Sequence, residues 1–440
     1  MEKEGMIPEL PEAFRDRVRR QLGAEWPAFE SAMEQPAIRG LRMNPFRAGS
    51  GTPFRDAGRE IPWMPGGYEI PLNSPAGITA AHEGGAFYLQ DPSAMIPAAV
   101  LDPKPGEILL DLCAAPGGKS TQMGLALAGE GLLVCNEPVP KRAAVLSRNL
   151  ERMGIPNSVV TCAYPRPLAE RWPEAFDGVL ADAPCSGEGM FRRHPETRAE
   201  WTPEKAAGCA ERQREILDEA AKMVRPGGRL VYATCTWNSA ENEEQVARFL
   251  ERHPEFETEP FALPGVDGGT GCFTCWPHRI RGEGQFTALL RKGGNAPARM
   301  PGGEADFRLS PEQRKAWEAS GIGGEEPNAA FGRTLIRLER IPELRGIQTL
   351  RLGLHLGELR GKIFLPDHAA AMCIRMPSAP RTEMSEADAL RYLAGETVAG
   401  GTNGWTVMTW QGIALGWGKG SEGQIRNHYP KGLRNSLLIG

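Results

Sequence analysis

The sequence lacks the features of a membrane-spanning, secreted or histone-like protein. It has no uninterrupted run of about 18 apolar residues, and its start, Met-Glu-Lys-Glu, lacks the basic and then apolar layout of a signal peptide. Nine cysteines in 440 residues follow no regular spacing, which favours reduced thiols over a disulfide framework. The formal net charge of −4 argues against a histone-like binder, although a local basic face would suffice to bind RNA. We therefore expect a cytoplasmic protein with no membrane partner.

The cysteines also give little reason to expect a metal site. Cys272 and Cys275 are the one pair close in sequence, and His278 is the nearest further ligand. A structural zinc site needs four ligands, so this set is incomplete. No metal is expected.

The most informative stretch runs from Ile108 to Thr121. Its apolar run, interrupted by Asp111, predicts a buried parallel strand, and Pro116-Gly117-Gly118 predicts a sharp turn. A helical pattern follows over residues 119–127. Such a strand, glycine turn and helix bring backbone N–H groups close to an anionic part of a ligand.

The details of the turn select among ligand classes. A P-loop requires glycine where this chain has Cys113, and residues 114–119 do not supply the G-x-G-x-x-G of a dinucleotide fingerprint. The next predicted strand, 132–135, is followed closely by Glu137, whose carboxylate is placed to accept hydrogen bonds from both hydroxyls of a ribose. A ribose with a small anionic group favours S-adenosylmethionine as the cofactor.

Strand and helix patterns alternate through residues 76–294 and predict an α/β fold with a Rossmann-like core. A helix over 203–224 is expected to stop at Pro226-Gly227-Gly228, before a strand at 229–233. Asn238 and Glu241 are expected to cap the helix that ends near Arg252.

Ligands of an open α/β sheet lie outside the carboxyl ends of its strands. Four groups of this chain are expected there: the 113–119 loop, Glu137, the corner from Asp182 to Cys185, and Cys235. Gln90, Asp91 and Ser93 are further candidates for this side of the sheet, unless Ser93 serves as a helix N-cap.

Cys185 and Cys235 each follow a predicted strand. One buried cysteine is commonly structural, but two that converge on a cofactor-sized crevice indicate chemistry. A thiolate that attacks C6 of a pyrimidine makes C5 able to take a methyl group, after which the C5 proton and the thiol must leave. Chemistry alone does not rank the two cysteines.

Asp182 and Lys119 can each have either a ligand-binding role or a purely structural one. Asp182 is suited to bind the amine edge of cytosine, or it is only a turn residue at the end of its strand. Lys119 binds the cofactor carboxylate or the pyrimidine O2, or it only starts its helix.

Three motifs of the chain resemble those of the RNA cytosine-5 methyltransferase family. The matching motifs are Asp-Leu-Cys-Ala-Ala-Pro-Gly-Gly-Lys at 111–119, Asp-Ala-Pro-Cys-Ser-Gly-Glu-Gly at 182–189, and Tyr-Ala-Thr-Cys-Thr at 232–236 with Glu-Asn-Glu at 241–243. Segments 412–419 and 427–434 resemble the bacterial methyltransferase F branch, which modifies small-subunit ribosomal RNA. The resemblance implies S-adenosylmethionine-dependent methylation of cytosine C5 in 16S ribosomal RNA through a covalent bond from a cysteine to C6.

The resemblance also implies residue roles. It makes Cys235 the nucleophile and Cys185 the group that assists proton removal and enzyme release, with Glu137 as the ribose ligand. Asp182 and Lys119 become contacts to the base or cofactor. The implied cofactor loop comprises Cys113, Ala114, Ala115, Pro116, Gly117, Gly118 and Lys119.

One position departs from the family pattern. Many relatives carry an acidic or amide residue after the third strand to hold the adenine amine, whereas this chain reads Thr-Cys-Ala-Tyr-Pro at 161–165. Either a backbone carbonyl or stacking by Tyr164 replaces that contact, or cofactor affinity is lower. The adenine contact is left unassigned.

Three domains are expected: an N-terminal α/β accessory domain (1–75), a Rossmann-like methyltransferase domain (76–294) and a C-terminal region (295–440). The tail combines basic residues with Trp417 and Tyr429, which favours phosphate contact and base stacking, and a solvated basic tail is the alternative. Resemblance to a PUA-like RNA-binding region favours RNA. The basic residues are Lys419, Arg426, His428, Lys431 and Arg434.

The expected partner is 16S rRNA or the 30S subunit, and neither DNA nor a second copy is expected. The target cytosine must leave its stack to reach the crevice. Two alternatives stay open: the same chemistry on transfer RNA, and a non-catalytic RNA-binding factor in ribosome assembly. The presence of both cysteines, Asp182 and the loop argues against the second.

Overall fold

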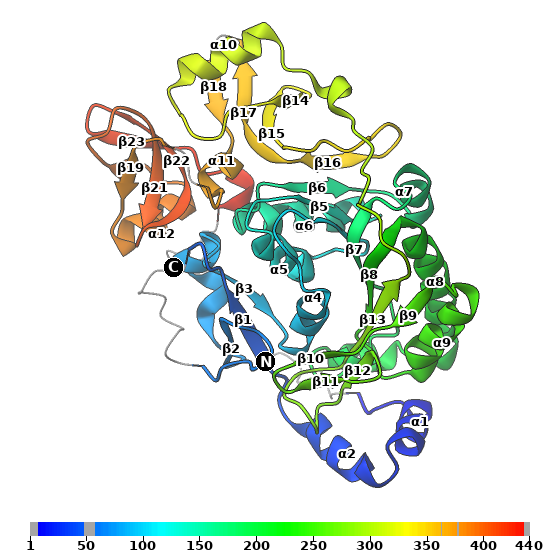
Figure 1. Cartoon of the computed structure of the whole chain (residues 1–440). Helices are drawn as coiled ribbons and strands as arrows, with labels where there is room; N and C mark the ends of the chain where they lie inside the picture. Colours follow the sequence, from blue (N-terminus) through cyan, green and yellow to red (C-terminus); the bar gives the residue numbers. More distant parts are fainter. Residues whose placement is uncertain (1–7, 48–57, 362, 376–377, 435–440) are drawn as a thin grey trace.

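A computed structural model describes residues 8–47, 58–361, 363–375 and 378–434 of the chain. Within them the largest sheet has nine strands, in the order β12-β13-β8-β7-β4-β5-β6-β16, with β9 pairing β13 off this path (Figure 1). The parallel strands are β4 (Ile108–Asp111), β5 (Leu132–Asn136), β6 (Ser158–Thr161), β7 (Phe176–Asp182) and β8 (Val224–Thr234). The antiparallel strands are β9 (Phe256–Thr258), β12 (Cys272–Cys275), β13 (Gln285–Lys292) and β16 (Thr349–Leu352). The predicted α/β fold is confirmed.

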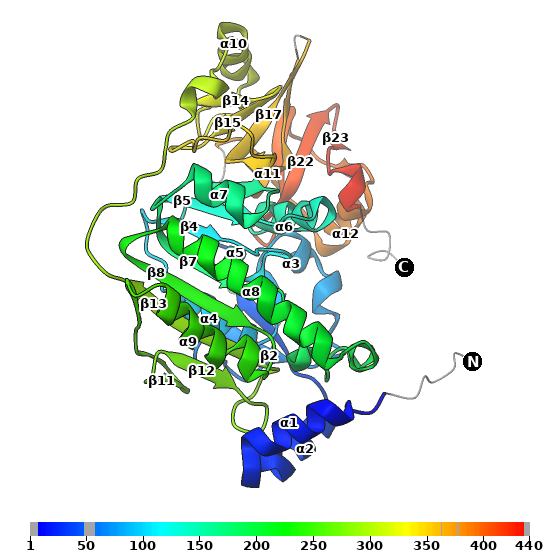
Figure 2. The same cartoon turned by 90° about the vertical axis from the view of Figure 1, so that its right-hand side faces the viewer.

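Helices cover both faces of this sheet (Figures 1 and 2). On β4, Ile108 and Leu110 pack into one core cluster and Leu109 into another, because successive side chains of a strand point to opposite faces. The first cluster includes apolar residues of α7 (Pro165–Arg171), α8 (Pro203–Met223) and α9 (Glu243–Arg252). The second includes those of α4 (Ile96–Leu101), α5 (Gly118–Ala126) and α6 (Pro140–Arg152). Burial on both faces explains the nearly continuous apolar strands of the sequence.

Two local predictions were wrong. β8 begins at Val224 and contains Pro226-Gly227-Gly228, because it pairs with the start of β7 through a register shift between Phe176 and Gly178. Asn238 caps the short turn Ser239–Glu241 instead of α9, whose N-cap is Asn242. Glu241 does not complete a capping box, because its carboxylate accepts hydrogen bonds from Ser186 and Gln213.

The N-terminal part consists of a helix pair and a small sheet. α1 (Glu12–Leu22) and α2 (Trp26–Glu34) form the helix pair at the lower end of Figure 1. β1 (Arg39–Met43) is the centre of an antiparallel sheet, between β2 (Gly67–Ile70) and β3 (Phe87–Gln90). α3 (Ala80–Glu83) precedes β3.

The C-terminal part contributes two sheets and one strand of the central sheet. One sheet has the order β14-β15-β17-β18 and the other β19-β21-β22-β23-β20. Their strands are β14 (Ala329–Phe331), β15 (Thr334–Arg337), β17 (Leu354–Arg360), β18 (Ile363–Pro366), β19 (Arg381–Glu383), β20 (Val398–Ala399), β21 (Gly404–Trp410), β22 (Ile413–Ser421) and β23 (Gln424–Asn427). β16 pairs with β6, so a segment beyond residue 295 extends the central sheet. The division into 1–75, 76–294 and 295–440 stays a prediction.

The remaining elements are short or peripheral. They include the hairpin β10 (Phe261–Leu263) and β11 (Val266–Gly268), and the helices α10 (Pro311–Ser320), α11 (His368–Met372) and α12 (Glu386–Ala394). Among the residues that the structure describes, no helix combines the length and apolar character needed to cross a bilayer.

Candidate active site

The loop after β4 carries the predicted cofactor-binding residues. β4 ends at Asp111 and α5 begins at Gly118, with Gly117 as its N-cap at a φ of 110°. Glycine adopts this left-handed conformation without steric cost. A Cβ on Gly117 would also lie 3.1 Å from the side chain of Leu146. Both the backbone conformation and the limited space therefore favour glycine here.

Two adjoining cavities open on this loop. The larger, of about 660 Å³, and the smaller, of about 270 Å³, share Cys113, Ala115, Asp182 and Cys235 as lining residues. The larger also takes in Glu137 and Cys185, and the smaller takes in Ala114, Pro116, Gly118 and Lys119. Of the residues predicted to bind the cofactor, Gly117 lines neither of these two cavities. A volume of several hundred Å³ accommodates a ligand of nucleoside size.

Glu137 forms part of the wall of the larger cavity, just beyond the end of β5. Its side chain is buried, and Oε1 accepts a hydrogen bond from the backbone N of Val139 at 2.9 Å. Its Oε2 lies 3.1 Å from Nη1 of Arg142. These contacts fix a carboxylate at the edge of the cavity, where it is suited to accept from the hydroxyls of a ribose.

The sulfur atoms of the two predicted cysteines lie in contact. Cys185 follows β7 and Cys235 follows β8, and their Sγ atoms lie 3.3 Å apart. The hydrogen bond with Cys235 and burial raise the pKa of Cys185 well above the ordinary range of a thiol. Cys185 therefore keeps its proton at neutral pH, and either sulfur atom of the pair can be the hydrogen-bond donor.

Lys119 and Asp182 form an ion pair beside the thiols. Nζ of Lys119 lies 2.7 Å from Oδ2 of Asp182, and both residues line the smaller cavity. Burial by itself lowers the pKa of Lys119, but the Asp182 carboxylate outweighs it and the pKa is raised. Lys119 is therefore a stable cation within reach of the cavity.

Asp111 is a buried carboxyl group at the end of β4 that the sequence showed only as a polar break in an apolar run. Burial raises its pKa to about 7, and the hydrogen bond from Oγ of Ser120, 2.6 Å from Oδ2, acts in the opposite direction. Oδ1 of Asp111 has no hydrogen-bond partner among the described residues. Asp111 lines the smaller cavity, so its protonation state affects the charge of the site near neutral pH.

Of the three candidates at the end of β3 and just after it, two line the site and one supports it. Gln90 and Asp91 line the smaller cavity, whereas Ser93 does not. Ser93 is not an N-cap either, since its hydroxyl donates to Asp91 and Oδ2 of Asp91 accepts from the backbone N of Ala94.

The segment after β6 leaves the adenine contact unassigned. Tyr164 is 75% exposed and lines the larger cavity. The backbone N and O of Ala163 are both bonded to the side chain of Asn136. The carbonyl of Ala163 is therefore already bonded, whereas the side chain of Tyr164 is open to the cavity.

The predicted stacking by Trp417 and Tyr429 was wrong. Both are buried: Nε1 of Trp417 donates to the backbone O of Asp367, and the hydroxyl of Tyr429 donates to Glu83. Trp405 is the half-buried aromatic residue beside the basic tail, with Nζ of Lys419 5.2 Å from its ring centroid. The sequence did not distinguish these tryptophans, because all lie in the same β-rich segment.

Among the described residues, no group of three or more His, Cys, Asp or Glu side chains gathers that could hold a metal ion. His278 binds Glu25 through Nε2 at 3.0 Å.

Family models match the chain in four segments. The model described as 16S rRNA methyltransferase RsmB/F matches residues 98–291, and the N-terminal domain of 16S rRNA methyltransferase RsmF matches residues 10–92. The RsmF rRNA methyltransferase first C-terminal domain matches residues 324–374, and the methyltransferase RsmF PUA domain matches residues 379–435.

Individual similar proteins and a solved structure agree with the family models. The chain is 31% identical to the ribosomal RNA small subunit methyltransferase F of Cronobacter sakazakii, over 98% of each chain. It is 32% identical to the protein of that description from Salmonella agona, over 96% of each chain. A methyltransferase homolog protein from Pyrococcus horikoshii has a similar structure, with a TM-score of 0.55 and 26% identity over 64% of this chain and 95% of that one.

Proposed function

Because the chain belongs to the RsmB/F family of 16S rRNA methyltransferases, we propose that it methylates C5 of cytosine in 16S ribosomal RNA with Cys235 as the nucleophile. The cofactor is S-adenosylmethionine. The observation that carries the proposal is the 3.3 Å separation of the Cys185 and Cys235 sulfur atoms beside a cavity walled by the 113–119 loop and Glu137.

Cys235 starts the reaction as a thiolate, after its proton has passed to solvent, and adds its Sγ to C6 of the cytosine, which makes C5 nucleophilic. S-adenosylmethionine, when bound, would supply the electrophilic methyl group and leave as S-adenosylhomocysteine. After C5 has taken that group, its proton leaves to solvent, the C5–C6 double bond re-forms and the bond from C6 to Sγ of Cys235 breaks. Cys185, a thiol at 3.3 Å, donates a hydrogen bond to the departing Cys235 thiolate and so assists release.

Lys119 and Asp182 orient the base in this proposal. Lys119 holds Oδ2 of Asp182, and Oδ1 of Asp182 is then available to accept from the exocyclic amine of cytosine. Uracil offers a carbonyl oxygen at that position and would be repelled. The pair thereby favours cytosine over uracil.

The substrate is ribosomal RNA, and the finer statements about it belong to this proposal. The target base is flipped out of its stack to reach Cys235. Exposed basic residues of the C-terminal part, among them Lys419, Arg426 and Lys431, contact phosphates of 16S rRNA or of the 30S subunit. The enzyme acts as a cytoplasmic monomer.

The test is transfer of labelled methyl groups to purified 16S RNA, 30S subunits and transfer RNA. Cys235→Ala is expected to be inactive and Cys185→Ala to accumulate a covalent RNA adduct, while Cys272→Ala, a half-buried thiol outside the site, serves as the control. Inactivity without adduct in Cys185→Ala, together with trapping by Cys235→Ala, would reverse the two roles. Labelling of transfer RNA alone, or of no RNA, would refute the proposed substrate or the catalytic activity.

A further inference from the structure

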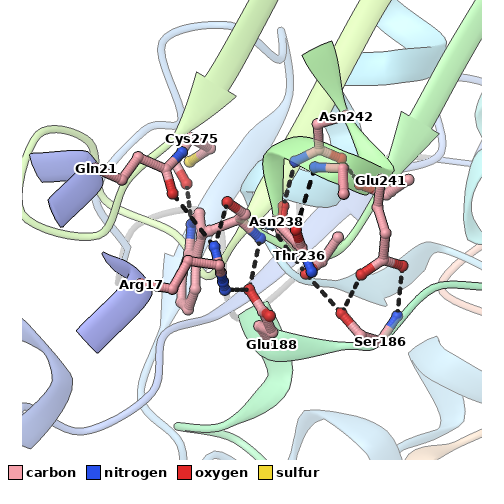
Figure 3. Close-up of polar contacts among 12 residues, drawn as sticks. Arg17, Gln21, Ser186, Glu188, Thr236, Asn238, Glu241, Asn242 and Cys275 are labelled. Atoms are coloured by element: carbon pink, nitrogen blue, oxygen red, sulfur yellow. Dashed lines mark hydrogen bonds and ion pairs between the residues drawn. The ribbon is translucent and has the colours of Figure 1, made fainter. Parts of the chain in front are cut away.

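Hydrogen bonds join the two thiol-bearing loops next to the thiols, among them the contact between Ser186 and Thr236 in Figure 3. Oγ of Ser186 lies 2.9 Å from Oγ1 of Thr236, and the backbone N of Gly189 donates to the backbone O of Cys235 at 2.9 Å. The backbone N of Trp237 donates to Oε2 of Glu188 at 3.2 Å. The residues next to Cys185 are therefore bonded directly to those next to Cys235.

Glu188 is the charged group in this contact, and its partner comes from the N-terminal helix pair. The side chain of Glu188 is 0% exposed, and its Oε2 lies 2.6 Å from Nη2 of Arg17 in α1. Nη1 of Arg17 donates to the backbone O of Trp237 at 3.2 Å and to Oε1 of Gln21 at 3.3 Å. One guanidinium group thus binds the Cys185 loop through Glu188, as Figure 3 shows, and the Cys235 loop through the backbone of Trp237.

Apolar contacts join the same elements. Phe14 of α1 packs edge-on against Phe191, with ring centroids 5.1 Å apart. Phe29 of α2 packs edge-on against Trp237, also at 5.1 Å. Phe191 follows Cys185 and Trp237 follows Cys235, so each thiol loop has its own aromatic contact with the helix pair.

The charge of Arg17 determines how Glu188 behaves. Burial raises the pKa of Glu188, and the Arg17 guanidinium opposes this rise. Oε1 of Glu188 has no hydrogen-bond partner among the described residues, so the ion pair is a large part of what compensates the buried charge. Without Arg17 the carboxylate would take up a proton or turn toward water, and either change would loosen the contact between the loops.

We propose that the N-terminal helix pair is a positioning element for catalysis, in which Arg17 and Glu188 set the spacing of the Cys185 and Cys235 sulfur atoms. This inference rests on the function proposed above for the two thiols. Arg17 and Glu188 are positioning residues, since neither lines either of the two cavities of the site.

The decisive variant is Arg17→Gln, which removes the charge and leaves Glu188 buried without its cation. The turnover rate is expected to fall about 10- to 100-fold, because displacement of catalytic groups by about 1 Å costs that order of rate. The dissociation constant for S-adenosylmethionine should stay unchanged, since the helix pair does not line the larger cavity. Arg17→Lys, which restores a cation, should recover part of the rate.

The control is Arg20→Gln on the same helix. Arg20 is exposed and its Nε donates to the backbone O of Asp16 within α1, so wild-type kinetics are expected. Should Arg17→Gln fail to fold, Glu188→Gln tests the same pair. It keeps an acceptor for the N–H of Trp237 but loses the charge, and a smaller loss of turnover is expected.

A second readout reports the thiol spacing without catalysis. Phenylarsine oxide bridges two neighbouring thiols, and tight binding is expected for the wild type and Arg20→Gln but not for Cys185→Ala. Arg17→Gln should bind it at least tenfold more weakly. Wild-type turnover and arsenical binding in Arg17→Gln would overturn the inference. Weakened arsenical binding in Arg17→Gln, together with a wild type that labels no RNA, would instead refute the proposed function and leave the positioning role standing.

Discussion

Replacing Gly189 by alanine tests how closely the two thiol loops must approach. A Cβ at this position would lie 2.6 Å from both Cα and O of Gly284, and 2.9 Å from the backbone O of Cys235. Ordinary contacts of a Cβ begin at 3.4 Å, so the segments must separate by about 0.8 Å (3.4 − 2.6) from Gly284 and about 0.5 Å (3.4 − 2.9) from Cys235. The neighbours are backbone atoms, which have no flexible side chain to move aside.

The expected effect on rate is larger than that on stability. Overpacking of this kind costs about 1–3 kcal/mol of the free energy of unfolding. The backbone of the proposed nucleophile moves as well, and a misplacement approaching 1 Å lowers turnover by roughly 10- to 100-fold. Single-turnover methyl transfer to 16S RNA measures the rate, and urea denaturation measures the stability.

Gly208→Ala is the matched control for Gly189→Ala. Gly208 lies in α8 with no atom within 4 Å of an added Cβ, so alanine there should leave the rate unchanged and stabilise the helix by about 0.5–1 kcal/mol. A folded Gly189→Ala variant whose turnover stays within about threefold of the wild type would refute the reasoning, because the thiols would then tolerate the displacement.

Three further predictions concern the charged residues of the site. Asp111 has a folded-state pKa of about 7 against an ordinary value of 3.8, so the folded protein binds more protons and loses stability as the pH rises from about 4 to 7, by on the order of 4 kcal/mol. Asp111→Asn should flatten that part of the curve in urea denaturation, and an unchanged curve would contradict the assignment. Lys119→Met leaves Asp182, 29% exposed, without its cation; about 1–2 kcal/mol of stability and at least tenfold in turnover should be lost, and wild-type turnover would exclude a role for Lys119 in the reaction. Glu137→Gln should weaken S-adenosylmethionine binding about tenfold in calorimetry because one charge-assisted hydrogen bond is lost, and unchanged affinity would remove Glu137 from the ribose site.

Predictions from local pattern were accurate for the strands and the helix around the cofactor loop. The apolar run and the Pro-Gly-Gly turn within residues 108–121 predicted a buried strand, which is β4, and a helix over 119–127, which is α5 shifted by one residue. The strand predicted at 132–135 was likewise found, and it is one residue longer at its carboxyl end. The local sequence decides these elements, because the pattern of apolar residues and the turn residues act over a few positions along the chain.

Local pattern failed where distant parts of the chain decide the outcome. Asn238 and Glu241 matched a capping box, but Glu241 bonds to Ser186, 55 residues away in sequence. Trp417 and Tyr429 matched a stacking surface, but the packing of the C-terminal sheets buries them. In each case a tertiary contact replaced the local one that the sequence suggested.

The sequence by itself determined the chemistry available to this protein: the two cysteines, the cation and carboxylate beside them, the glycine turn and the order of strands that brings them to one edge of a sheet. Only the tertiary structure decided that the two sulfur atoms lie 3.3 Å apart and that Arg17, 171 residues before Glu188, supplies the charge that the buried carboxylate needs. The physical reason is the distance along the chain over which each effect acts. Turn and strand preferences act between neighbours along the chain, whereas burial and charge compensation depend on which distant elements pack together.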